Sequence, residues 1–183
     1  DIITLFPALF LSPLRESIIK IAQEKKLVAI RIHDLRDFTH DKHKTADDKP
    51  YGGGPGMVMK PEPIFECVEA LRRTKKKQWV VYLTPQGTRF DQKKADSLLR
   101  KKHMGLLCGH YEGIDQRVCD ELIDEEISIG YYVTSGGEIP ALCLIDTMLM
   151  IKVDLGNGAA AMRQFATFCE YIYYLKSIFI NSS

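Results

Sequence analysis

The apolar residues at the start of this sequence lack the features of a secretory signal peptide or a membrane-spanning segment. Its first stretch, DIITLFPALFLSP, is interrupted by Pro7 and Pro13 and has neither a basic region nor a small-residue cleavage site, so we expect it to be neither a signal peptide nor a membrane span. Neither sign of charge is in large excess, because the formal net charge is only +1. Whole-molecule charge therefore does not point to a polyanionic partner.

Cysteine occurs without the spacing of a metal site or a disulfide framework. The five cysteines are odd in number, widely spaced and mostly embedded in apolar segments: Cys67, Cys108, Cys119, Cys143 and Cys169. This pattern is typical of reduced thiols, so we expect a cytoplasmic protein without a structural metal.

Two nucleotide-binding signatures are missing as well. The sequence contains neither the GxGxxG of a dinucleotide-binding fold nor the GxxxxGK[ST] of a P-loop. A generic Rossmann-type nucleotide enzyme is therefore disfavoured.

What the sequence does contain is an alternation of short β-branched runs with longer amphipathic ones. Its 183 residues suffice for one domain with a buried core. Candidate strands are 1–5, 28–33, 79–84, 104–108 and 126–129. Candidate helices are one ending near Lys25, one after Pro61, one after Asp91 and one over 138–150. The pattern predicts an α/β fold with a mainly parallel sheet and flanking helices.

Local signals mark where two of these helices begin. Ser12, Pro13 and Glu16 have the spacing of an N-cap, a first-turn proline and a capping acid. Asp91 precedes a segment that places Ala95 and Leu98 on one face. We expect both Ser12 and Asp91 to cap helices.

Three strand ends are followed by glycine-flanked turns. These are PQG (85–87), GHYEG (109–113) and GYYVTSGGEIP (130–140). Each glycine alone is compatible with ordinary turn chemistry. Because the carboxyl ends of parallel strands meet at one edge of a sheet, the three turns together predict one pocket lined by backbone. With no phosphate motif, its ligand is expected to be recognised by its base and small polar groups.

The segment 34–60 is a long connection with an unusual mixture of residues. It combines histidines, acids and bases with the glycine-rich stretch KPYGGGPGMVMKP (49–61). A disordered linker is the competing interpretation, but the composition favours a structured functional loop. A metal site built from His40, Asp41 and His43 is conceivable, although the spacing matches no standard ligand set.

Four blocks of this sequence resemble the conserved blocks of one protein family. They are RDFTHDKHKTADDKPYGGGPGMVM (36–59), YLTPQG (82–87), LLCGHYEGIDQRV (106–118) and SIGYYVTSGGEIPALCLID (128–146). Their order and spacing are similar to those of the bacterial tRNA (guanine-N1)-methyltransferases, and the resemblance extends from about Ile2 to Asp146.

The resemblance implies a fold, an assembly and a cofactor. It implies a SPOUT-type methyltransferase domain over residues 1–157, with a deep C-terminal trefoil knot that forms the cofactor site. It also implies a homodimer. Residues 158–183 would then be a partial linker and helix, the remnant of a tRNA-binding C-terminal domain. The cofactor would be S-adenosylmethionine, which becomes S-adenosylhomocysteine. The implied cofactor-binding residues are Tyr82, Leu83, Thr84, Pro85, Gln86, Gly109, Tyr111, Glu112, Ile129, Gly130, Tyr132, Val133, Thr134, Gly136, Gly137 and Pro140.

The implied reaction is methyl transfer to N1 of guanosine 37, immediately 3′ of the tRNA anticodon. Guanine N1 carries a proton, so a general base is needed, and an arginine would stabilise charge developing on O6. The target base would have to be unstacked from the anticodon loop.

The sequence departs from the family at the residues that carry the chemistry. Met150 stands near the position of the family's arginine, and Tyr131 replaces an acid. No aspartate follows Gly158, and Asp154 precedes LGN whereas the family's base follows it, so Asp154 is only a weak candidate for the base. Either segments of a longer protein are missing, or the chain is a cofactor-binding relative impaired in catalysis. The well-kept blocks favour the first explanation.

Overall fold

The computed structural model describes residues 1–49, 56–74 and 78–157. Its main sheet has five strands in the order β2-β1-β6-β5-β7, and every neighbouring pair is parallel. The strands are β1 (Ile2–Thr4), β2 (Ile32–Asp34), β5 (Trp79–Arg89), β6 (Met104–Cys108) and β7 (Glu125–Ser128). The predicted parallel α/β fold is confirmed.

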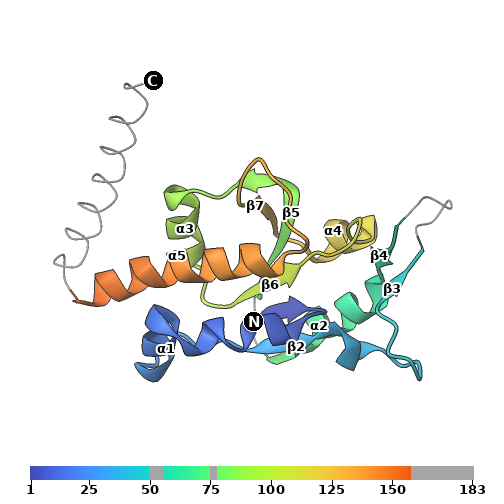
Figure 1. Cartoon of the computed structure of the whole chain (residues 1–183), viewed down its shortest axis with the longest axis horizontal. Coiled ribbons are helices and arrows are strands. Elements are labelled where there is room, and N and C mark those ends of the chain that lie inside the picture. The colour runs from blue at the N-terminus through green and yellow to red at the C-terminus, as the bar shows by residue number, and fades with distance from the viewer. Residues whose placement is uncertain (50–55, 75–77, 158–183) are drawn as a thin grey trace.

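Helices cover both faces of this sheet, as Figure 1 shows. On one face lie α1 (Ser17–Glu24), α3 (Gln92–Leu99) and α5 (Glu138–Asn157), together with the 3-10 turns η1 (Pro7–Phe10) and η2 (Pro13–Arg15). On the other lie α2 (Pro61–Thr74), α4 (Gln116–Leu122) and the 3-10 turn η3 (Leu35–Phe38). Two apolar layers therefore enclose the sheet, as parallel sheets require.

Alternation along the central strands supplies both layers. In β5, Val81 faces the layer of α1, α3 and α5, whereas Val80 and Tyr82 face the layer of α2 and α4. In β6, Leu106 and Leu107 divide in the same way. Because successive side chains of a strand point to opposite faces, a short continuous apolar run serves two cores.

The predicted strand boundaries needed two corrections. The strand expected at 28–33 is wrong for residues 28–31, because β2 pairs only with β1, in the register Ile2 to Ile32 and Thr4 to Asp34. Val28 and Ile30 instead pack their side chains against the core without a strand partner in the described part of the chain. The strand expected to end at 84 continues to Arg89, because it pairs again with β7 beyond Leu83.

Helix boundaries were predicted unevenly. Ser12 makes no capping hydrogen bond, since Pro13–Arg15 form a 3-10 turn and α1 begins only at Ser17. Asp91 caps α3 as expected, accepting a hydrogen bond from the Lys94 backbone N–H at 2.7 Å. The short helix α4 was not predicted, and α5 continues past 150 to Asn157.

The described part of segment 34–60 is structured. It contains η3 and two short antiparallel strands, β3 (Asp47–Asp48) and β4 (Val58–Met59). Residues 50–55, including the Tyr-Gly-Gly-Gly block, lie outside the described residues. Met59 is fully buried, whereas Met57 and Val58 are half-buried, so the segment re-enters the core at Met59.

The histidines of this segment have structural partners. His40 lies 2.9 Å from the Glu66 carboxylate, and Asp41 accepts hydrogen bonds from the backbone N–H groups of His43 and Thr45. Asp41 thus organises a turn, and its hydrogen bonds with Thr45 lower the pKa of its carboxyl. Within residues 1–49, 56–74 and 78–157, no group of three candidate metal ligands comes together.

No helix in the described ranges is both long and apolar enough to cross a bilayer. Cys67, Cys108, Cys119 and Cys143 are all free thiols. Cys169 lies outside the described residues.

Candidate functional site

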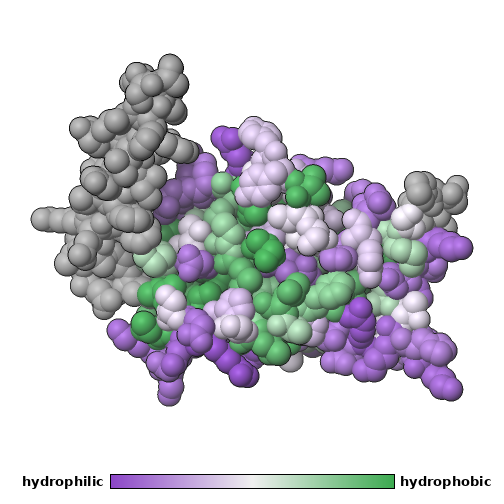
Figure 2. Space-filling model, in the orientation of Figure 1, coloured by the Kyte–Doolittle hydropathy of each residue, from purple (hydrophilic) through white to green (hydrophobic). Residues whose placement is uncertain are grey.

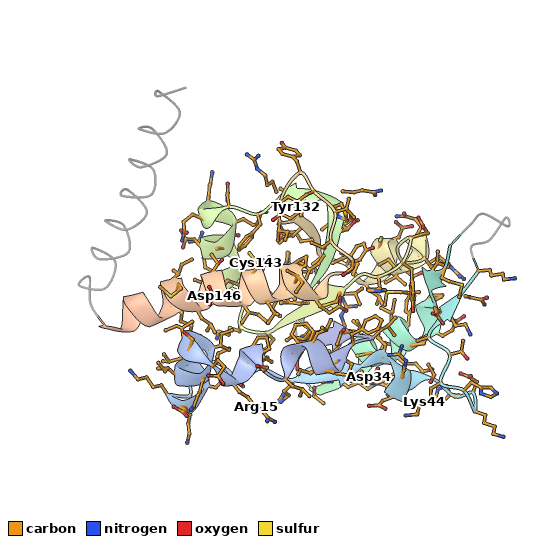
Figure 3. All side chains as sticks on the ribbon, viewed as in Figure 1. Arg15, Asp34, Lys44, Tyr132, Cys143 and Asp146 are labelled. Carbon is orange, nitrogen blue, oxygen red and sulfur yellow. The ribbon has the colours of Figure 1, made fainter. Side chains whose placement is uncertain are left out.

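The three glycine-flanked turns meet at one cavity of about 200 Å³. It lies beside residues 82–86 of β5 and at the carboxyl ends of β6 and β7, near the position of Tyr132 in Figure 3. Its lining residues are Tyr82 to Gln86, Gly109 to Gly113, Ile127 to Ile129, Tyr132 to Gly137, and Pro140. The predicted convergence of the three turns is confirmed.

The first turn arises from an interruption in the pairing of β5 with β7. Leu83 and Thr88 both align with Ile127, so the four residues between them leave the ladder. Such a bulge bends a strand and re-aims its side chains. Here it brings Thr84, Pro85 and Gln86 into the cavity wall.

The second turn begins at Gly109, where the backbone passes close to Tyr82. A Cβ atom at position 109 would lie 2.6 Å from an aromatic carbon of Tyr82 and 3.2 Å from the Leu83 carbonyl oxygen. Tyr82 is only 7% exposed, and burial raises the pKa of its phenol to about 12. Glycine is therefore the residue that this close approach allows.

A backbone hydrogen bond joins the second turn to the third. The Gly137 N–H donates to the Gly109 carbonyl at 2.7 Å, and His110 pairs with Gly136 as an isolated antiparallel bridge. The chain leaving β7 at one edge of the sheet thus reaches β6, on the far side of β5. One wall of the cavity is built entirely from this crossing segment.

Tyr111 and Glu112 connect the cavity to the long segment 34–60. Tyr111 has a positive φ of 59°, and the pKa of its phenol is raised by burial and by hydrogen bonding to Asp47 of β3. The Glu112 N–H donates to the Met57 carbonyl at 3.0 Å. Gly56 has a φ of 92°, and a Cβ there would lie 2.6 Å from Glu112 Cγ. The end of the glycine-rich stretch therefore packs directly on Glu112.

Every predicted cofactor-binding residue except Gly130 lines the cavity. Gly130 instead makes room for Tyr132, since a Cβ there would lie 2.5 Å from the Tyr132 ring. The residues that the sequence prediction missed are His110, Gly113, Ile127, Ser128 and Ser135. His110 could have been found from its place inside GHYEG.

Met150 and Tyr131, two positions where the sequence departs from the family, do not line this cavity. Met150 is a half-buried residue of α5 that does not line it. Asp154 belongs to α5, but its side chain lies outside the described ones. Tyr131 is 93% exposed next to the cavity loop, with the Arg89 guanidinium 5.2 Å from its ring centroid.

The chemistry of the lining favours an uncharged or cationic ligand. Among the described lining residues, Glu112 is the acid, His110 is the only basic side chain, and no lysine or arginine is present. A phosphate chain would find no cationic partner there. Pockets for drug-sized ligands measure about 300–1,000 Å³. A ligand of that size therefore requires the exposed Tyr132 and Val133 to shift, or remains partly in solvent.

Comparisons with known proteins agree on one protein family. A profile described as tRNA (Guanine-1)-methyltransferase TrmD matches residues 1–174. The chain is 53% identical over 164 residues to a tRNA (guanine-N(1)-)-methyltransferase of Dictyoglomus turgidum, covering 90% of this chain and 66% of that protein. It is 48% identical over 179 residues to the enzyme of the same name from Carboxydothermus hydrogenoformans, covering 96% and 70%. The chain thus spans about two thirds of the length of these curated relatives.

A solved structure agrees with the sequence relatives. The crystal structure of tRNA (m1G37) methyltransferase from Aquifex aeolicus is similar with a TM-score of 0.76 and 39% identity. The similarity covers 82% of this chain and 67% of the other.

Proposed function

Because the chain belongs to the tRNA (guanine-1)-methyltransferase family, we propose that it methylates N1 of guanosine 37 in tRNA, using S-adenosylmethionine. The observation that carries the proposal is the single cavity formed by three of the sequence blocks that resemble this family. The alternative is a cofactor-binding RNA protein on the same fold that is impaired in catalysis. It is not favoured, because relatives about half identical over most of the chain are named as methyltransferases.

The residues of the cavity fit S-adenosylmethionine. Its adenosine needs an apolar pocket with backbone donors and acceptors. The interrupted part of β5 and the turn after β7 offer such a pocket through Leu83, Ile129 and their neighbours. Its amino group and sulfonium are cationic, and Glu112 is the carboxylate in the lining. The absence of lysine and arginine from the lining also suits a cofactor without phosphate.

When bound, the cofactor would supply an electrophilic methyl group. In our proposal the protein contributes mainly position, since holding methyl donor and acceptor in line removes much of the barrier. Gly109 and Gly137 let the segments around the cavity pack closely against one another, and Tyr132 and Val133 would cover the cofactor from the solvent side.

The proton on guanine N1 must leave to a base, and a carboxylate is the natural acceptor. Among the lining residues, Glu112 is the only carboxylate, and we assign it to the cofactor's cationic groups. Asp154 remains the weak candidate for the base. We place the reaction in the cytoplasm, where tRNA is available.

We further propose that the chain between β5 and α5 is knotted and that the protein works as a homodimer. The crossing of the segment after β7 over the end of β5 supports the knot. An apolar face over α5 and η1 supports the dimer. In Figure 2, hydrophobic residues gather along this face. It includes Leu9, Leu11 and Ile139, each about half exposed, and the exposed Cys143.

The test of the proposed function is methyl transfer from labelled S-adenosylmethionine to tRNA transcripts. We expect label to enter a transcript with guanosine at position 37 and not one with adenosine there. Calorimetry with S-adenosylmethionine alone measures cofactor binding separately. Cofactor binding without incorporation by the full-length protein would favour the catalytically impaired alternative.

A further inference from the structure

The structure contains a buried carboxylate beside the cavity that the proposed function does not use. Glu138 is the first residue of α5 and is 2% exposed. Its Oε1 accepts a hydrogen bond from the Thr4 hydroxyl at 2.8 Å. The positive end of the α5 dipole also favours a negative charge at this place. A buried carboxylate nevertheless remains costly unless a cation lies nearby.

His110 lies beside this carboxylate. Its Nδ1 lies 3.8 Å from Glu138 Oε2 and, within the described part of the chain, has no hydrogen-bond partner. The imidazole is held by Phe6 and Tyr111, whose ring centroids lie 4.6 Å and 4.8 Å away. A separation of 3.8 Å is too long for a hydrogen bond but short enough for an ion pair. The two side chains are therefore close enough to interact electrostatically.

These two side chains sit at the junction of two cavity loops. His110 belongs to loop 109–113, and Glu138 directly follows loop 130–137. A Cβ at Gly136 would lie 2.3 Å from both Glu138 Oε2 and His110 Nδ1. The pair therefore occupies the space beside residue 136 and is compatible only with glycine there.

We propose that His110 and Glu138 act as a positioning pair that fixes these two loops against each other and thereby sets the affinity for the cofactor. Thr4 anchors the pair to β1, so the loops are held against an inner strand of the sheet. The assignment of the ligand rests on the proposed function, whereas the coupling between the loops does not.

The first experiment measures loop coupling without any ligand. His110→Phe keeps an aromatic ring beside Phe6 and Tyr111 and removes the ring nitrogens, and Glu138→Gln keeps a group that can accept from Thr4. In each variant we expect hydrogen exchange of the Gly137 amide, which bonds the Gly109 carbonyl, to rise about tenfold. Exchange within β1 and β6 should stay unchanged. The matched controls His103→Phe and Glu121→Gln alter exposed residues and should change neither loop.

The second experiment measures the dissociation constant of S-adenosylmethionine by calorimetry. Each variant is expected to bind about tenfold more weakly, and the double variant no more weakly than either, because the two side chains act as one unit. Gly136→Ala should reproduce the same loss. Two outcomes would contradict a coupled pair. One is a loss of affinity in the double variant that equals the product of the two single losses. The other is faster hydrogen exchange in only the loop that carries the substitution. Absence of binding by the unmodified protein would instead refute the proposed function, and the exchange experiment would still decide the coupling.

Discussion

At the scale of single residues, the absence of a side chain decides how closely the segments around the cavity approach one another. At Gly109 one methyl group would meet the buried ring of Tyr82 and the Leu83 carbonyl. At Gly105, in the preceding strand β6, it would lie 3.2 Å from the terminal amide nitrogen of Gln78, the far end of a flexible side chain. A change to alanine should therefore affect cofactor binding differently at these two positions, although it adds one methyl group at each.

We expect Gly109→Ala to weaken binding of S-adenosylmethionine by at least about a hundredfold while the protein remains folded, because Tyr82 has to move into the cavity. Gly105→Ala is the matched control and should leave binding nearly unchanged. Calorimetry measures the affinity, and circular dichroism checks the fold. Equal affinities in the two variants would contradict the placement of the cofactor.

A second residue-scale prediction concerns acid stability. Asp115 caps α4, and hydrogen bonds from Arg117 lower the pKa of its carboxyl from its ordinary value of 3.8 to about 2. A carboxyl whose pKa is lower in the folded state stabilises the fold above its unfolded pKa, and this contribution is lost as the pH falls toward the folded pKa.

Asp115→Asn should therefore differ most from the unmodified protein at neutral pH, and the difference should shrink between about pH 4 and pH 2. Asparagine retains a capping oxygen, so the helix keeps its N-cap. Urea unfolding at a series of pH values measures the difference in the free energy of unfolding. A difference that does not change with pH would show that the Asp115 charge does not contribute.

At the scale of elements, the start of helix α3 depends on a capping side chain. Asp91 satisfies the Lys94 N–H at the start of α3, a helix that buries Ala95 and Leu98 against α5 and the sheet. Asp91→Ala should lower the free energy of unfolding by about 1 kcal/mol. Asp96→Ala, an exposed change inside the same helix, should have a smaller effect. Chemical denaturation compares the two, and equal losses would contradict a capping role.

The elements also show what sequence patterns can predict. Strands β5 and β6 were predicted because their apolar runs serve two cores at once. The end of β5 was missed because it depends on renewed pairing with β7 beyond Leu83, a contact between distant segments. Helix α4 is seven residues long, too short for a clear helical period. The Asp115 cap and the buried Val118 and Leu122 were its available signals.

The cavity was predicted better than its surroundings. Turns after parallel strands must meet at one edge of the sheet, so the convergence of GHYEG and the segment after β7 followed from topology alone. The identity of the cofactor came from family resemblance, since no spacing of residues specifies a sulfonium. The pairing of His110 with Glu138 could not be foreseen, because it depends on the chain crossing between the ends of two strands.

At the scale of the whole molecule, α5 differs from an ordinary surface helix. It buries Leu144, Ile145 and Met148 on one side and still exposes Ile139 and Cys143 on another. A helix that is apolar on all sides is normally covered on all sides. A second copy of the chain is the cover that the proposed homodimer supplies.

We expect Leu11→Glu to shift the protein from dimer to monomer, because a charge would be buried in an apolar interface. Lys20→Glu alters an exposed side chain of α1 and serves as the control. Sedimentation equilibrium measures the mass of the assembly. A Leu11→Glu protein that stays dimeric would place the interface elsewhere.

The strand order has a further consequence for how the protein is made. β1 is synthesised before β2 and β6. It pairs on one side with β2, but its other neighbour, β6, is synthesised much later, so Ile2 cannot pair with Leu106 until then. Closing contacts between such distant segments slows folding, and an apolar strand with an unpaired edge is prone to association with other chains. The nascent chain is therefore most vulnerable to aggregation during the interval between the synthesis of β2 and that of β6.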